Sequence, residues 1–151
     1  MMKPFTFKLQ RPLDLKEKEE AHLKSELQRQ RNRVEDCQRM IEENKQAMTE
    51  ALIECKKMQE PYFDVSQRLL FPYYWHRLQE TEAELHQQLA QEQEKEQALQ
   101  EQLMKTMRDR KVLEKLRDKH LTAYKKEALR EEQIILDEIA LNRFMAKDKG
   151  E

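Results

Sequence analysis

A seven-residue repeat of apolar side chains is the feature that most constrains the fold of this chain. Between about residues 20 and 60, two interleaved sets of apolar residues recur: Leu27, Val34, Ile41, Met48 and Cys55, with Leu23, Cys37, Ala51 and Met58. A second repeat continues to about residue 124 on Leu78, Leu85, Leu99 and Leu113, with Trp75, Leu89, Leu103 and Tyr124. Such heptads are typical of coiled coils, in which both sets face a partner helix.

The composition agrees with long helices that are surrounded by water. Of 151 residues, 39% are charged and 38% are apolar, with one Gly and four Pro, so helix formers dominate and helix breakers are rare. No segment approaches the roughly 18 to 20 apolar residues that span a bilayer, and the N-terminus lacks the apolar core of a signal peptide. We therefore expect a cytoplasmic protein. Cys37 and Cys55 lie too far apart on one helix to form a disulfide, and we expect both to be packing residues.

Two prolines separate the repeats. Pro61 and Pro72 each remove an amide donor and crowd the preceding helical turn, so a straight, uninterrupted helix does not easily accept them. We therefore predict an all-α fold, a long two-helix antiparallel coiled-coil hairpin with an overhanging C-terminal helix. The predicted single domain, residues 1–151, has an extended arm (1–12), a first helix (13–60), a turn region (61–72), a second helix (73–145) and a frayed tail (146–151).

A reversal centred near residue 67 predicts which parts of the two helices meet. It matches apolar to apolar at several levels, setting Cys55 near Leu78, Met48 near Leu85 and Val34 near Leu99. Residues 121 to about 145 are then left without a partner in the first helix, an overhang of roughly 37 Å. This overhang carries apolar residues that need covering: Ala128, Ile135, Leu136, Ile139 and Phe144. The N-terminal arm, in which Phe5, Phe7 and Leu9 alternate with polar residues, is expected to cover part of it.

Polar residues and charges are unevenly distributed along the hairpin. Residues 35–104 carry a net charge of about −8, whereas the two ends together carry about +7, so the turn half is acidic and the pole with both chain ends is basic. Polar residues also interrupt both repeats, which predicts an association of modest stability: Gln30, Asn44, Glu92, Glu96, Thr106 and Arg110.

The stretch "PYFDVSQRLLFPYYW", residues 61–75, contains six of the ten aromatic residues. Ser66 is a candidate cap for the second helix, and Tyr62, Leu69 and Trp75 are candidates to plug the open end of the coiled coil. Since a turn needs only a few apolar residues, the remaining rings suggest a partner site. The predicted gate-binding or chaperone-binding residues are Phe63, Phe71, Tyr73, Tyr74 and Trp75.

The sequence offers no basis for catalysis or for binding a metal or cofactor. A single glycine, Gly150, excludes glycine-rich phosphate loops, and a thin coiled coil offers no enclosed pocket for a nucleophile. The one Glu-x-x-His motif, at residues 19–22, is half of what a di-iron bundle requires. The basic residues 105–126 are either a solvated flank or a face for an acidic protein; nucleic-acid binding is a weaker alternative, because only Tyr124 is available to stack on a base.

Two end motifs carry a family resemblance: "FKLQRPLDLKEKEE", residues 7–20, and "LEKLRDKHLTAYKKEALREEQIILDEIALNRF", residues 113–144. Together they resemble the flagellar type III export protein FliJ family, although Pro12 stands where an aliphatic residue is expected. The resemblance implies a coiled coil similar to the γ stalk of rotary ATPases. It also implies that the pole with both chain ends enters the hexameric ring of the export ATPase.

The resemblance further implies contacts with the cytoplasmic domain of the membrane export gate and with export chaperones. The protein would then lie at the cytoplasmic face of the inner membrane, held there through its partners only. Carried onto this chain, the end motifs suggest these ring-facing residues: Phe7, Leu9, Leu13, Leu136, Ile139, Arg143 and Phe144. The sustained heptads leave one alternative open, a self-associating structural rod or adaptor unrelated to secretion.

Overall fold

Two helices, α1 (Gln10–Lys57) and α2 (Val65–Lys149), make up nearly all of residues 3–62 and 64–150, which the computed structural model describes. The helices pack against each other and these ranges contain no strand, so the predicted all-α helical hairpin is confirmed. The sequence suggested one domain, whereas the packing separates two compact units. Unit 1 contains residues 3–20 and 105–150, and unit 2 contains residues 21–62 and 64–104.

The helix boundaries differ from the predicted ones at all four ends, and α1 ends at Lys57 rather than at residue 60. Helix α1 begins at Gln10, which places Pro12 in the first turn, where amide groups have no partner inside the helix in any case. Helix α2 begins at Val65, so the predicted turn region at 61–72 is too long, and α2 continues to Lys149, within the predicted frayed tail. Pro72 lies inside α2 at an exposed position, where water can satisfy the carbonyl that lost its amide partner.

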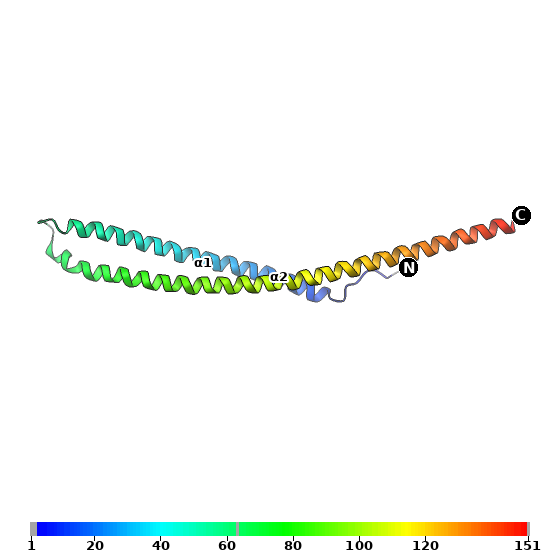
Figure 1. The fold of residues 1–151 in the computed structure, drawn as a ribbon, viewed down its shortest axis with the longest axis horizontal. Helices are drawn as coiled ribbons and strands as arrows, with labels where there is room; N and C mark the ends of the chain where they lie inside the picture. Colours follow the sequence, from blue (N-terminus) through cyan, green and yellow to red (C-terminus); the bar gives the residue numbers. More distant parts are fainter. Residues whose placement is uncertain (1–2, 63, 151) are drawn as a thin grey trace. The chain divides into compact units, whose positions relative to one another are not determined.

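The predicted heptads of α1 form the core of unit 2. The buried apolar residues on α1 follow the repeat: Leu23, Leu27, Val34, Cys37, Ile41 and Ala51. Cys37 is buried and Cys55 is half-buried, both as free thiols, which confirms that they are packing residues. In Figure 1 this part of α1, drawn in blue to cyan, runs beside the green part of α2.

Two polar contacts establish the antiparallel register of unit 2. The Nε2 of Gln30 donates a 2.9 Å hydrogen bond to the carbonyl of Glu92, and the Nδ2 of Asn44 donates a 3.2 Å bond to the carbonyl of Leu78. Asn44 rather than Cys55 therefore lies beside Leu78, and the predicted register is wrong by about three helical turns. The pairing centre moves from residue 67 toward residue 61, which agrees with the earlier start of α2.

The register error has a physical cause in the polar residues of the repeat. Gln30 and Asn44 are 4% and 8% exposed, so each must find a hydrogen-bond partner inside the coiled coil. Gln30 also bonds the carboxylate of Glu92. An unpaired buried amide costs roughly 1–3 kcal/mol, which is comparable to the gain from burying one aliphatic side chain. The register in which Gln30 and Asn44 find hydrogen-bond partners is therefore more stable than a register that only matches apolar residues.

Unit 1 is built on the first turns of α1, the N-terminal arm and the C-terminal part of α2. Leu13 has no exposed surface and is the largest fully buried side chain among the described residues. Thr106 is the one buried residue of α2 in the described ranges. Beyond Ala128, every residue of α2, from Leu129 to Lys149, is exposed, and so is Gly150 after it. The part of the predicted overhang that stays uncovered in the described residues therefore begins after Ala128.

Candidate functional site

The N-terminal arm of unit 1 packs on α2 through aromatic contacts. The ring of Phe7 meets the ring of His120 edge-on at a centroid distance of 5.8 Å, and Phe5 lies 5.5 Å from Tyr124. The hydroxyl of Tyr124 donates a 2.7 Å hydrogen bond to the carbonyl of Lys3. The arm therefore covers Tyr124, which lies within the predicted overhang, as expected.

The structure divides the predicted ring-facing residues of the N-terminal end into two groups. Phe7 is 8% exposed and Leu13 is 0% exposed, so both side chains pack inside unit 1. Leu9 is 38% exposed and can meet a partner directly. Phe7 and Leu13 therefore support the arm and the start of α1 in this conformation, rather than presenting a surface.

The predicted ring-facing residues of the C-terminal end are all exposed. Leu136 is 53% exposed, Ile139 44% and Phe144 68%, and Arg143 is exposed beside them. Sequence reasoning gave this helix one apolar stripe and missed a set of exposed apolar residues elsewhere on its circumference: Ile134, Leu141 and Met145. Plotting every residue at 100° per position, rather than seeking one stripe, would have found them.

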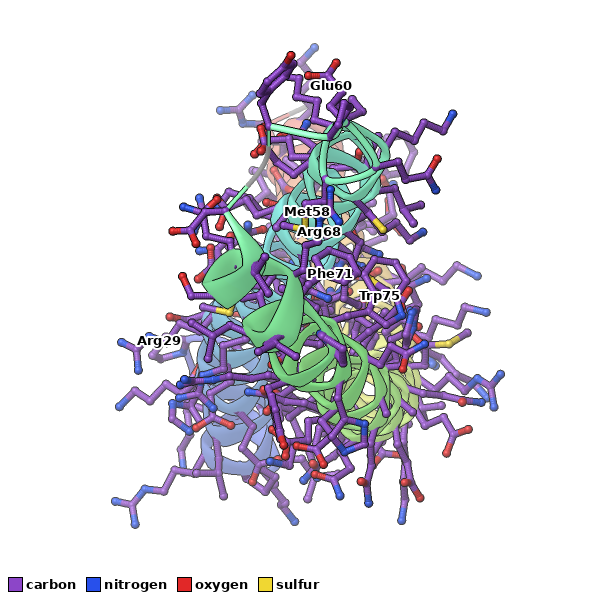
Figure 2. The ribbon with its side chains drawn as sticks, turned by 90° about the vertical axis from the view of Figure 1, so that its left-hand side faces the viewer. Arg29, Met58, Glu60, Arg68, Phe71 and Trp75 are labelled. Atoms are coloured by element: carbon purple, nitrogen blue, oxygen red, sulfur yellow. The ribbon has the colours of Figure 1, made fainter. Side chains whose placement is uncertain are left out.

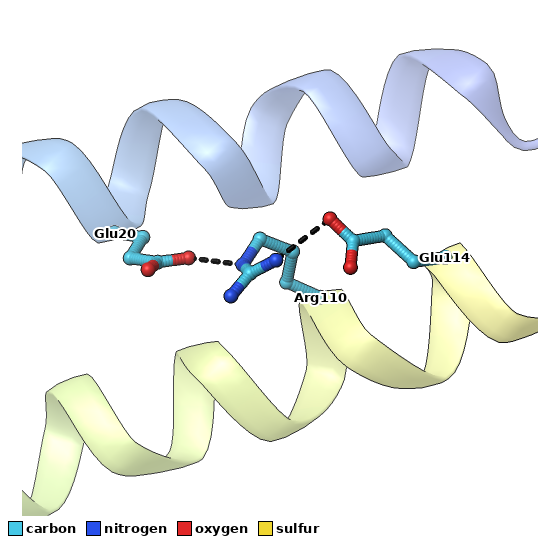
Figure 3. A network of polar contacts seen from close by, with 3 residues as sticks. All are labelled: Glu20, Arg110 and Glu114. Atoms are coloured by element: carbon cyan, nitrogen blue, oxygen red, sulfur yellow. Dashed lines mark hydrogen bonds and ion pairs between the residues drawn. The ribbon is translucent and has the colours of Figure 1, made fainter.

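A network of charges holds α1 to α2 within unit 1. Arg110 bonds the carboxylate of Glu20 through Nε and that of Glu114 through Nη1, the latter at 2.6 Å (Figure 3). The hydrogen bond to Glu114 and, with a smaller effect, the hydrogen bond to Glu20 raise the pKa of Arg110 above its usual value, so the guanidinium stays charged. Glu20 is only 5% exposed, and a carboxylate at that depth needs such a partner.

Lys16 lies next to this network. Its Nζ is 3.2 Å from a carboxylate oxygen of Glu19 and 3.6 Å from one of Asp109. Both carboxylates raise the pKa of Lys16, and Glu19 has the larger effect.

The turn of unit 2 is closed by Asp64 and Arg68. The Oδ1 of Asp64 accepts a 3.1 Å hydrogen bond from the backbone amide of Ser66, so Asp64 caps α2 and the predicted cap, Ser66, is wrong. The Nη2 of Arg68 donates a 2.6 Å bond to the carbonyl of Glu60, which ties the first turn of α2 back to the chain after α1. Figure 2 labels Arg68 and Glu60 in this part of the chain.

The aromatic residues of the turn have different surroundings. Phe71 and Trp75 stack at a centroid distance of 6.2 Å and are half-buried (Figure 2). Phe71 also lines a hollow of about 240 Å³ together with Ala51 of α1 and Met58, which follows α1. Trp75 thus fits its predicted role as a plug. Tyr74 is 51% exposed and lines the same hollow. Phe63 lies outside the described residues.

A second part of the turn faces water. Tyr62 is 99% exposed and Leu69 is 68% exposed, so the prediction that they plug the coiled coil is wrong. Leu69 instead shares one exposed stripe of α2 with Val65 and Tyr73, because residues four apart lie on the same helical face. We call Val65, Leu69 and Tyr73 the tip stripe. The start of α2 at Val65, capped by Asp64, places these three residues on one helical face.

Two further observations bear on function. Within residues 3–62 and 64–150, no helix is both long enough and apolar enough to cross a membrane. Across the same part of the chain, no group of three or more His, Cys, Asp or Glu side chains is arranged to hold a metal ion.

Comparison with known proteins identifies one family. No curated protein and no solved structure gives a significant match to the chain. The sequence profile described as Flagellar FliJ protein matches residues 5–149, which covers both helices, the arm from Phe5 and the turn between them. The chain therefore belongs to the flagellar FliJ protein family.

Proposed function

We propose that this chain is a non-enzymatic stalk and adaptor of the flagellar type III export apparatus. Its family gives it a role related to flagellar export. In the proposal, the C-terminal end of α2 enters the ring of the export ATPase hexamer and promotes its assembly or activity. The turn of unit 2 contacts the cytoplasmic domain of the export gate or an export chaperone. The protein acts in the cytoplasm, at the inner membrane, through these partners.

One observation carries the ring proposal: the exposed part of α2 is apolar on more than one side. Ile135 and Phe144 are nine residues apart, which is two and a half helical turns, so they lie on opposite sides of the helix. They are 53% and 68% exposed. A surface groove covers one side of a helix, whereas a helix that is apolar on opposite sides needs a partner that surrounds it. The lumen of a ring is such a partner.

The charge of the adjoining segment supports the same placement. Residues 105–126 contain nine basic and three acidic side chains. Most of the basic ones are exposed, including Lys111, Lys115 and Lys119. A cationic flank next to an apolar helix speeds association with an acidic protein face and orients the apolar part toward it.

Removing residues 130–151 is expected to abolish stimulation of the export ATPase by this chain. The helical hairpin should remain folded, because every described residue in the deleted segment is exposed and contributes little to the core. The measurement is ATP hydrolysis by the purified ATPase at increasing concentrations of the full or shortened chain. Thermal unfolding followed by circular dichroism tests the integrity of the hairpin.

A substitution pair sharpens this experiment. Ile135→Ser with Phe144→Ser should also lose stimulation, since it removes exposed apolar surface from opposite sides of α2 while keeping its length. Met40→Ser with Leu52→Ser is the matched control, because these residues are 47% and 51% exposed on α1 of unit 2. Full stimulation by the shortened chain would refute ring insertion through this helix.

The tip stripe is proposed to bind the export gate or a chaperone. Replacing Leu69 and Tyr73 with Ser is expected to weaken that binding at least about tenfold, because aromatic and aliphatic side chains at an exposed contact supply much of its affinity. The measurement is titration of labelled chain with the gate domain or with each chaperone.

The control for the tip stripe is Val112→Ser, which changes an exposed aliphatic residue of α2 in unit 1. Phe71→Ala should instead lower the thermal midpoint, since Phe71 is half-buried and stacked on Trp75. Unchanged affinity of the Leu69 and Tyr73 variant for every partner would leave this stripe without the proposed role.

A further inference from the structure

One stripe of the exposed C-terminal helix is complementary to itself. Glu132, Leu136, Ile139 and Arg143 follow one another at intervals of four, three and four residues, so they share one face of α2. All four are exposed. Glu132 and Arg143 make no ion pair with any residue in the described ranges. The stripe thus has an acidic end, an apolar centre and a basic end.

The order of these residues allows the stripe to pair with a copy of itself in one direction. If two stripes meet antiparallel about an axis between residues 137 and 138, Glu132 of each chain lies opposite Arg143 of the other. Leu136 then lies opposite Ile139, also twice, as a two-fold interface requires. A parallel pairing would set Glu132 against Glu132 and Arg143 against Arg143, so repulsion disfavours it.

We propose that two copies of this chain associate through this stripe when the chain is free. The interface is one face of a helix of about 20 residues, roughly 30 Å long, which is small for a stable protein complex. The dimer is therefore weak and depends on concentration. It covers only one side of α2, so Phe144, Leu141 and Met145 stay exposed or half-exposed at its back.

In the dimer, each copy covers the apolar residues of the other copy's stripe until a partner of higher affinity binds. It occupies Leu136, Ile139 and Arg143, so a chain paired in this way cannot present them elsewhere. A partner that surrounds the helix would bury more apolar surface than the second copy does and would displace it. The self-association itself does not rest on the proposed function, since it follows from the order of charges and apolar residues on α2.

Sedimentation velocity of the purified full-length chain at several concentrations tests the proposal. The wild-type chain should shift from monomer toward dimer as its concentration rises. Glu132→Arg should raise the dissociation constant about tenfold, because two attractive pairs become two repulsive ones, and Arg143→Glu should do the same. The combined Glu132→Arg, Arg143→Glu chain should return to within about threefold of the wild type, because the swap restores both opposite-charge pairs.

Several results would overturn the proposal. The proposal fails if the wild-type chain stays monomeric up to millimolar concentration. It also fails if the single charge variants dimerise with the same dissociation constant as the wild type. Failure of the charge swap to restore association would exclude the antiparallel pairing. Circular dichroism should show equal helicity for all variants, because the changed residues are exposed. None of these measurements involves the ATPase, so their outcome is independent of the ring-insertion experiment.

Discussion

Replacing Leu13 with Ala is expected to lower the free energy of unfolding by about 2–5 kcal/mol. Leu13 has no exposed surface, so the substitution removes buried apolar atoms and leaves a cavity in unit 1. Small folded proteins are stable by only about 5–15 kcal/mol, so a loss of this size is a large part of the total. Urea unfolding followed by circular dichroism measures it.

Leu15→Ala is the matched control for this substitution. Leu15 is 56% exposed on the same turn of α1, so the same chemical change should cost less than about 0.5 kcal/mol. The two variants also distinguish a packing role of Leu13 from a binding role, because the end motif predicted that Leu13 faces the ATPase ring. If Leu13→Ala abolished stimulation of the ATPase at unchanged stability, Leu13 would have a direct role that its burial argues against.

Replacing Arg110 with Ala is expected to produce the second large loss of stability. The substitution leaves the carboxylate of Glu20 in a nearly inaccessible position without the guanidinium that bonds it. Breaking a buried ion pair from one side is strongly destabilising, because the remaining charge stays desolvated. Thermal unfolding should show a clear drop in the midpoint, well beyond that of Arg39→Ala, which removes an exposed pair with Asp36 at 3.0 Å.

The double variant Glu20→Leu with Arg110→Leu should recover most of this loss. Well-packed apolar residues can replace a buried ion pair at little cost or with a gain, since no charge has to be desolvated. Recovery would show that the network costs stability and serves to select one register, as buried polar groups do in other coiled coils. A double variant as unstable as Arg110→Ala would instead show that the charges themselves stabilise unit 1.

The helical content and the reversal were predictable because their causes are local. Heptads, abundant helix formers and a single glycine leave α-helix as the one regular structure open to most of the chain. The prolines correctly indicated that the chain reverses near them. They did not determine where α2 begins, because Pro72 is tolerated on the exposed side of the helix, while Asp64 supplies the cap that starts α2.

The register was not predictable from apolar matching alone. The predicted pairing treated Gln30 and Asn44 as imperfections, although their hydrogen bonds to Glu92 and to the carbonyl of Leu78 distinguish one register from the next. A slip by one heptad keeps many apolar contacts but separates these polar partners. The same error led to the expectation that Tyr62 and Leu69 would plug the coiled coil, whereas both are exposed.

By itself the sequence determined that this chain is a helical hairpin with an acidic turn half and an amphipathic C-terminal helix, because periodicity and composition act within each segment. It also carried the end motifs of its family. Only the tertiary structure decided which side chains remain available for partners, because exposure depends on what the other helix covers. Phe7 and Leu13 share an end motif with Leu9, yet packing against α2 and the arm buries the first two and leaves Leu9 accessible.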